Sequence, residues 1–216
     1  MGTSNFSEYI DSLIPFAQGA LGELQKNAYA ENLPIIDKDA AAFLSALIRI
    51  KRPARILEIG CAIGFSAALM AENMPAESHI VTIDRYEYMI AHAKGNFSKL
   101  GIENKIRLIE ADAKVALQQL IDEGNLFDFV FLDAGKGQYN GMISQILQLL
   151  ANRGVLLADD IFQKGKISLE ITDIEKRQRT TYRNMRSFLE RIFADESLVS
   201  SILPLADGML LSVKKG

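Results

Sequence analysis

Two stretches of the sequence place acidic side chains where a cation could bind. Asp133 follows the apolar run 127–132, and Asp159 and Asp160 follow the apolar run 154–158. If these runs are adjacent parallel strands, they lie roughly 4.8 Å apart and the three carboxylates can converge. Oxygen ligands without His or Cys favour Mg²⁺, Mn²⁺ or Ca²⁺ over Zn²⁺. We predict a divalent-metal site here; a simple helix-capping turn is the alternative.

Lys136 follows Asp133 in the same segment and could move a proton. A cation that holds two neighbouring oxygens of a substrate would align one of them for reaction and lower the pKa of its hydroxyl. Lys136 could then accept the hydroxyl proton if the nearby metal lowers the pKa of the lysine. We predict Lys136 as the catalytic base, against the alternative of an ordinary surface lysine.

A glycine-containing loop follows the first predicted strand. Gly60 and Gly64 allow a tight turn and a close approach of the backbone to a ligand. Their spacing is Gly-x-x-x-Gly, not the Gly-x-Gly-x-x-Gly of dinucleotide-binding loops. The spacing favours a smaller, zwitterionic cofactor over a pyrophosphate, unless the glycines only make a turn.

Polar residues also stand at the ends of other predicted strands, where open parallel sheets bind ligands. Glu58 could bind the ammonium or hydroxyls of a cofactor, directly or through water, and Asp84 could accept both ribose hydroxyls. Asp112 and Ala113 follow a third strand and could contact an adenine. Each residue alone could be a solvated strand end, but their order on successive strands favours a cofactor site.

The elements that would position these residues alternate along the chain. Strands are predicted at 55–59, 79–83, 106–109, 127–132 and 154–158, and helices at 66–73, 87–100, 113–122 and 139–150. This alternation predicts an α/β fold with a mostly parallel sheet and helices on both faces. Two β-rich runs, 199–203 and 209–213, enclose Asp207-Gly208, which predicts a C-terminal antiparallel hairpin.

A single domain over residues 1–216 fits this pattern. Residues 1–52 contain no good strand and are predicted to form a helical N-terminal extension, with Asp37 as the N-cap of its last helix. Its apolar residues Phe6, Tyr9, Ile10, Leu13 and Ile14 could cover the active site or a partner subunit.

Composition narrows the class of protein. The single cysteine, Cys61, excludes an internal disulfide framework and a Cys-rich zinc site. The net charge of −3 argues against wholesale electrostatic binding of nucleic acid, although a local basic patch remains possible. The sequence contains no signal-peptide pattern and no apolar stretch of roughly 20 residues, so we expect a cytoplasmic protein with no membrane segment.

The glycine loop resembles the first motif of the catechol and caffeoyl-CoA O-methyltransferases (family 3), in the segment Leu57-Glu58-Ile59-Gly60-Cys61-Ala62-Ile63-Gly64-Phe65-Ser66. The resemblance runs from about Pro34-Ile35-Ile36 to the C-terminus. It implies a Rossmann-like, seven-stranded sheet and S-adenosylmethionine (SAM) as methyl donor. The SAM-binding residues it implies are Ile36, Glu58, Gly60, Ser66, Asp84, Asp112, Ala113 and Asp133.

In that family the general base is a Lys at the position of Lys136, and the metal ligands are Asp, Asp and Asn. Asp133 and Asp159 match this pattern, but Asp160 replaces the usual Asn. The added negative charge predicts stronger metal binding or a changed preference among divalent ions. Members of the family are commonly dimers, so we expect a homodimer.

A basic run near 176–193, predicted to be a helix, gives a clue to the substrate that accepts the methyl group. Arg179, Arg183 and Arg186 share one helix face, and Lys166 lies upstream. The run could bind phosphate of a nucleic acid or of a coenzyme A thioester, or be a solvated face. The tail Leu203-Pro204-Leu205-Ala206-Asp207-Gly208-Met209 resembles the bacterial branch that methylates 5-hydroxyuridine in tRNA, whose 5-hydroxyl and 4-carbonyl are adjacent oxygens.

We therefore predict tRNA as the acceptor, with contacts from Tyr139, Lys166, Arg179 and Arg183. Catechol-like phenols or caffeoyl-CoA-like esters are the alternative. Two other classes stay open: a nucleotide-binding oxidoreductase, which the missing dinucleotide fingerprint disfavours, and a non-catalytic SAM- or RNA-binding module, which the retained lysine and acids disfavour.

Overall fold

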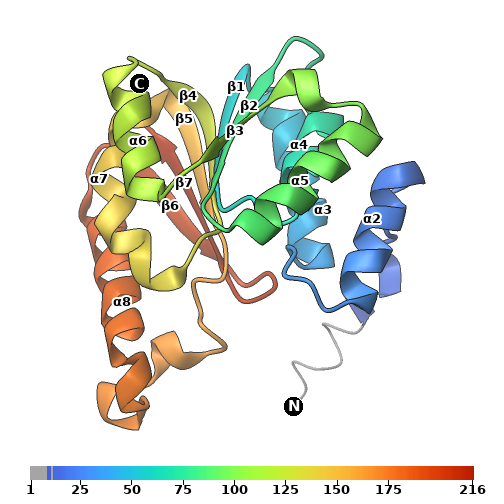
Figure 1. Ribbon diagram of the computed structural model, residues 1–216. Helices are drawn as coiled ribbons and strands as arrows, with labels where there is room; N and C mark the ends of the chain where they lie inside the picture. Colours follow the sequence, from blue (N-terminus) through green and yellow to red (C-terminus); the bar gives the residue numbers. More distant parts are fainter. Residues whose placement is uncertain (1–8, 11) are drawn as a thin grey trace.

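The structure, a computed structural model, describes residues 9, 10 and 12–216 and is built around a seven-stranded sheet (Figure 1). The strands are β1 (Arg55–Ile59), β2 (His79–Asp84), β3 (Ile106–Glu110), β4 (Phe127–Leu132), β5 (Leu150–Ala158), β6 (Leu198–Leu203) and β7 (Met209–Lys214). Their order is β3-β2-β1-β4-β5-β7-β6. β1 to β5 pair in parallel, and β7 pairs antiparallel with both β5 and β6. The predicted sheet and its C-terminal hairpin are confirmed.

Helices cover both faces of the sheet, as predicted. They are α2 (Gly19–Ala30), α3 (Lys38–Lys51), α4 (Phe65–Asn73), α5 (Glu87–Leu100), α6 (Ala113–Asp122), α7 (Tyr139–Leu149) and α8 (Arg179–Ala194). In Figure 1, α2 to α5 lie on one side of the sheet and α6 to α8 on the other. The hydrophobic core is divided in the same way between the two layers.

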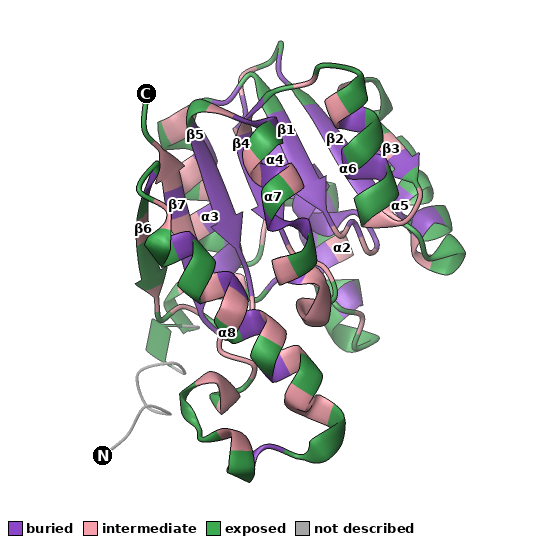
Figure 2. Ribbon diagram, turned by 90° about the vertical axis from the view of Figure 1, so that its left-hand side faces the viewer, coloured by how far each residue is buried: buried purple, intermediate pink, exposed green. Residues whose placement is uncertain are grey.

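The central strands are buried on both faces, which explains their continuous apolar sequences. Leu57 and Leu132 pack toward the layer of α6 to α8, whereas Ile56 and Phe131 pack toward the layer of α2 to α4. Figure 2 shows these strands buried beneath the helices. Two exceptions are Glu58 on β1 and Thr82 on β2, which are polar and completely buried.

The sheet order reverses direction between β1 and β4. The chain leaves β1 toward α4 on one face and leaves β4 toward α7 on the other. The two loops therefore diverge and leave a crevice at the carboxyl ends of the strands, which is where such sheets bind ligands. Asp133 ties the two strands together there, because its backbone N–H donates to the carbonyl of Ile59 over 2.9 Å.

Two elements begin more than one residue away from the predicted position. β5 begins at Leu150, which was predicted to end a helix, because Leu150 pairs with Phe127 ahead of a register shift. α8 begins only at Arg179, after a short 3₁₀ turn. The Arg179 guanidinium donates to the carbonyls of Thr172 and Ile174 at 3.2 and 2.9 Å, which fixes the chain just before the helix.

The N-terminal extension contains α2 and α3, with Asp37 at the predicted N-cap position of α3. Phe6 lies outside the described residues, whereas Tyr9 and Leu13 are well exposed. No helix within the described ranges is long and apolar enough to cross a membrane.

Candidate functional site

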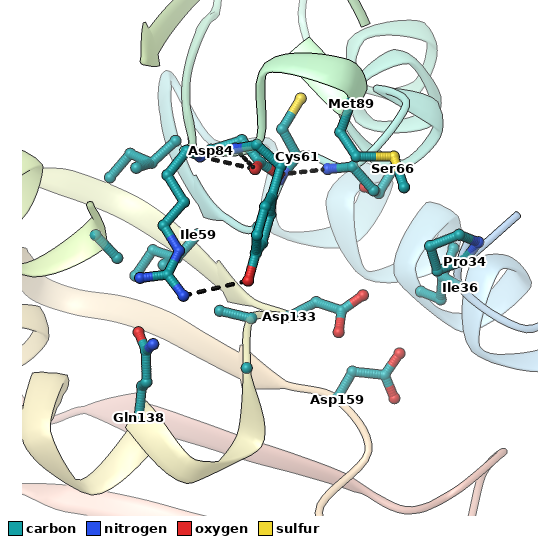
Figure 3. A pocket seen from close by; sticks show the side chains of 18 of the residues that line it. Pro34, Ile36, Ile59, Cys61, Ser66, Asp84, Met89, Asp133, Gln138 and Asp159 are labelled. Atoms are coloured by element: carbon teal, nitrogen blue, oxygen red, sulfur yellow. Dashed lines mark hydrogen bonds between the residues drawn. The ribbon is translucent and has the colours of Figure 1, made fainter. Parts of the chain in front are cut away.

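A cavity of about 560 Å³ lies at the carboxyl ends of the central strands (Figure 3). The predicted cofactor residues that line it are Ile36, Gly60, Ser66, Asp84, Asp112, Ala113 and Asp133. Lys136, Asp159 and Asp160 line the same cavity. Figure 3 shows Asp84 in its upper part and Asp133 with Asp159 below. The fold thus brings the predicted cofactor loop and the predicted chemical groups into one space.

The glycine loop is shaped by its contact with β4. Gly60 has a φ of +102°, and a Cβ built on it would lie 1.9 Å from the backbone oxygen of Asp133. Any other residue would therefore meet both backbone strain and a backbone clash. Gly64 has a φ of +83°, and its Cβ would lie 2.6 Å from the ring of Phe97. Gly60 thus allows the loops after β1 and β4 to meet beside the cavity, and Gly64 allows the loop to pack against α5.

The carboxylate of Asp84 organises the same loop. One oxygen accepts hydrogen bonds from the backbone N–H groups of Cys61 and Ala62, at 3.1 and 2.9 Å. The other accepts from the backbone N–H groups of Arg85 and Tyr86, at 2.7 and 2.9 Å. Asp84 therefore fixes the loop and still lines the cavity, and its predicted contact with a ribose stays a prediction.

Asp112 closes another side of the cavity as the N-cap of α6, where its side chain accepts from the backbone N–H of Lys114. Its second oxygen lies 3.0 Å from the Arg85 guanidinium, which also donates to the hydroxyl of Tyr86 over 3.2 Å. Arg85, Tyr86 and Met89 line the cavity but were not predicted. Their position directly after Asp84 was the signal that could have identified the first two.

Glu58 lies behind the cavity wall rather than in it. It is completely buried and accepts hydrogen bonds from the hydroxyls of Ser66, over 2.6 Å, and of Thr82. Burial raises the pKa of Glu58 to about 8. Of the residues in this group, Ser66 lines the cavity. Glu58 itself does not line the cavity, so the structure does not bring it into direct contact with that space, and its predicted cofactor contact, directly or through water, stays a prediction.

Lys136 lies at the centre of the acidic cluster. Its ammonium is 2.6 Å from Asp133 Oδ1, 3.1 Å from Asp160 Oδ2 and 3.1 Å from the hydroxyl of Tyr139. Burial lowers the pKa of Lys136, but Tyr139 and the two carboxylates raise it, and the net shift is upward. Lys136 is thus a cation in this arrangement, and it becomes a base only when those negative charges are compensated.

Asp159 is the most buried of the three predicted metal ligands, at 3% exposure. Its Oδ1 accepts from the backbone N–H of Asp160 over 2.8 Å. Burial, followed by the charges of Asp133 and Asp160, raises the pKa of Asp159 to about 8. Asp160 itself has a φ of +56°, a left-handed conformation that Asp and Asn adopt more readily than most residues.

The predicted metal site is not formed in this arrangement. β4 and β5 are adjacent, as the prediction required, and the three acids share the cavity. Across the described part of the chain, however, no three His, Cys, Asp or Glu side chains are arranged to hold a metal ion. The ammonium of Lys136 bridges Asp133 and Asp160 instead. The residues have the oxygen chemistry for a hard cation but not the geometry.

Comparison with known proteins decides the family, because a sequence model of the O-methyltransferase family matches residues 15–215. The chain belongs to this family. The O-methyltransferase is 29% identical over 199 residues to "Probable caffeoyl-CoA O-methyltransferase 2" of Dictyostelium discoideum, covering 91% of this chain and 84% of that protein.

Solved structures agree on the fold of the O-methyltransferase. The "putative caffeoyl-CoA O-methyltransferase" of Staphylococcus aureus is 26% identical, with a TM-score of 0.88, over 98% of this chain and 100% of that chain. An O-methyltransferase of Bacillus cereus in complex with SAH is 23% identical, with a TM-score of 0.85, over 98% of this chain and 97% of that chain.

The residues predicted to contact an acceptor are not gathered at one surface of the O-methyltransferase. Tyr139 is completely buried, its hydroxyl lies 3.1 Å from the carbonyls of Leu132 and Asp159, and its ring packs against Phe188. Substrate contact by Tyr139 is therefore corrected to a supporting position beneath Lys136.

The basic residues predicted to contact an acceptor also differ in what they touch. Arg179 donates to backbone carbonyls, as described above, and Arg186 donates to the hydroxyl of Tyr182 over 2.7 Å. Lys166 is half-buried in the 3₁₀ turn Lys166–Ser168. Arg183 is exposed, and its predicted contact with an acceptor stays a prediction. Part of the predicted basic surface thus serves the packing of the segment around α8.

Proposed function

We propose that this O-methyltransferase transfers the methyl group of SAM to a hydroxyl that has a second oxygen beside it, with 5-hydroxyuridine in tRNA as the preferred acceptor. The observation that carries the proposal is the single cavity in which the glycine loop, Asp84 and Asp112 adjoin Asp133, Lys136 and Asp159. The SAH complex of the Bacillus cereus protein supports SAM as the donor.

Under this proposal, one end of the cavity binds the methyl donor and the other end binds the acceptor. Asp84 would hold the ribose, and Asp112 with Ala113 would meet the adenine. The methyl group would then point toward Lys136, which lies next to Asp133. Under the proposal, the acceptor oxygen would lie in line with that methyl group, and much of the rate enhancement would come from this alignment.

Support for a tRNA acceptor comes from the segment that follows Asp160. Lys164 and Lys176 are exposed cations on this segment, which joins the acidic cluster to α8, and Arg183 is an exposed cation within α8. Exposed cations can bind phosphates without reading sequence. The similarity of the C-terminal tail to tRNA 5-hydroxyuridine methyltransferases points the same way.

A second candidate acceptor is a catechol-like phenol or a caffeoyl-CoA-like ester. The similarity to "Probable caffeoyl-CoA O-methyltransferase 2" of Dictyostelium discoideum favours it. The same exposed cations could bind the phosphates of coenzyme A, and the same cavity geometry would align either acceptor.

Labelled SAM distinguishes the acceptors. We expect label to enter tRNA that contains 5-hydroxyuridine, with little transfer to catechol or caffeoyl-CoA offered in parallel. Unmodified tRNA is the control, since it lacks the acceptor hydroxyl but keeps every phosphate. Efficient labelling of catechol or caffeoyl-CoA alone would replace the preferred acceptor with the second candidate.

The same assay, run with and without a chelator, tests the predicted dependence on Mg²⁺, Mn²⁺ or Ca²⁺. We expect activity to fall on chelation and to return with the added divalent ion. Activity that survives complete removal of divalent ions would show that the ion pairs of Lys136 are the working arrangement. Metal dependence, the homodimer and the cytoplasmic location all stay predictions.

Asp84→Ala should weaken SAM binding by about 10- to 100-fold, because it removes both the proposed ribose acceptor and the four backbone hydrogen bonds that shape the loop. Calorimetric titration with SAM measures the change. Asp122→Ala is a suitable control. Asp122 is the last residue of α6, at the opposite end from the Asp112 cap that lines the cavity, and in the described structure its side chain bonds only to Gln118. An unchanged SAM affinity in Asp84→Ala would contradict the proposed ribose contact.

A further inference from the structure

Glu58 is a buried carboxyl group with no cationic partner among the described residues that contact it. Its side chain is completely buried, and its two oxygens accept from the hydroxyls of Ser66 on α4 and Thr82 on β2. A carboxylate offers about four acceptor positions, so two hydroxyls satisfy it only in part. A buried ionised carboxylate in this state is costly.

The titratable groups that face Glu58 do not compensate its charge. They are Cys61 in the loop after β1, Asp84 at the end of β2 and Asp133 after β4. Burial first, and then the two aspartates, raise the pKa of Glu58 to about 8, while Ser66 and Thr82 oppose the shift. Near neutral pH the carboxyl group therefore carries a proton when the cavity holds no ligand.

Ser66 connects this buried group to the cavity. It lies in the first turn of α4, lines the cavity and places its Oγ 2.6 Å from Glu58 Oε1. A hydroxyl has one proton to donate. While Ser66 donates to an ionised Glu58, it can only accept a hydrogen bond from a ligand. When Glu58 is protonated, the Ser66 proton is free to turn toward the cavity.

We propose that Glu58 is a positioning residue that releases its proton to solvent when a cationic methyl donor binds, so that Ser66 then accepts a hydrogen bond from the ammonium of that donor. The inference rests on the proposed function, since SAM supplies the cation. SAM carries a sulfonium and an ammonium against one carboxylate, whereas SAH lacks the sulfonium charge. Binding of SAM should therefore release more of the Glu58 proton than binding of SAH.

Calorimetric titration of the whole chain with SAM tests this coupling directly. Near pH 7, in buffers with different ionisation enthalpies, the apparent binding enthalpy should show release of close to one proton per SAM bound. A cation lowers the pKa of Glu58, so affinity for SAM should rise with pH, by up to about tenfold per unit, and level off above about pH 8. SAH should show a smaller release.

Substitutions of Glu58, Asp159 and Thr82 show which side chain releases the proton when SAM binds. Glu58→Gln should abolish the release. Asp159→Asn should retain it, which matters because Asp159 also lines the cavity and has a pKa raised to about 8. Thr82→Val removes a hydrogen bond to the ionised form of Glu58, so it should shift the pH dependence upward, and Thr82→Ser should restore it. The threonine variants provide the test if Glu58→Gln does not fold.

The outcomes separate this inference from the proposed function. SAM binding without proton release, or release that persists in Glu58→Gln, would overturn the role of Glu58 and leave the methyl donor in place. Release that disappears in Asp159→Asn but not in Glu58→Gln would assign the proton to Asp159 and also overturn it. Failure of the chain to bind SAM at all would overturn both proposals.

Discussion

Lys136→Met should lower the turnover of methyl transfer by about 10²- to 10⁴-fold, the usual contribution of a positioned acid or base. The side chain contacts Asp133, Asp160 and Tyr139 at the acceptor end of the cavity, away from the Asp84 and Asp112 side chains. The affinity for SAM should therefore change little. Turnover is measured with labelled SAM, and affinity by calorimetry on the same preparation.

Lys136→Arg separates a base from a fixed positive charge. Arginine keeps the charge between the carboxylates but stays protonated at any accessible pH. If Lys136 accepts the proton of the acceptor, both variants lose activity to a similar extent. Substantial activity in Lys136→Arg would show instead that the lysine acts only through its charge, and full activity in both variants would remove Lys136 from the catalytic site.

Gly60→Ala should unfold more readily and lose SAM binding. The new Cβ would lie 1.9 Å from the backbone oxygen of Asp133, on a residue whose φ is +102°. A backbone oxygen cannot rotate away, so the loops after β1 and β4 must separate. Strain and overpacking together should lower the free energy of unfolding by about 3–5 kcal/mol. Thermal or urea denaturation measures this loss, and titration with SAM measures the effect on the cavity.

Gly95→Ala is the matched control for that substitution. Gly95 lies within α5, and a Cβ there would meet no atom within 4 Å. Alanine in a helix interior is up to about 1 kcal/mol more favourable than glycine, so this variant should be slightly more stable and bind SAM normally. If Gly60→Ala behaves like Gly95→Ala, the close contact of the two loops is not required for the site.

The sequence alone determined most of the fold because its signals are short-range. The alternation of apolar strands with amphipathic helices predicted β1 to β4 almost to the residue, and Asp207-Gly208 predicted the hairpin of β6 and β7. Once the strands were located, the rule that parallel sheets bind ligands at their carboxyl ends predicted that Gly60, Asp84 and Asp133 would share one cavity.

Only the tertiary structure decided what each side chain touches. Nothing near Lys136 in the sequence shows that its ammonium would bridge Asp133 and Asp160, which arrive on different strands. The burial of Tyr139 depends on Phe188, far along the chain on α8.

Glu58 shows the same limit. Its position at a strand end predicted a contact with a ligand, directly or through water, but in the packed structure Ser66 of α4, which donates to Glu58, is the one of the two that lines the cavity. Strand ends follow from local backbone preferences, whereas burial, hydrogen-bond partners and pKa values depend on residues that are distant in the sequence and meet only when the layers pack. The chain thus specifies where its chemical groups gather, and the packing of α4, α7 and α8 specifies which of them reach the cavity.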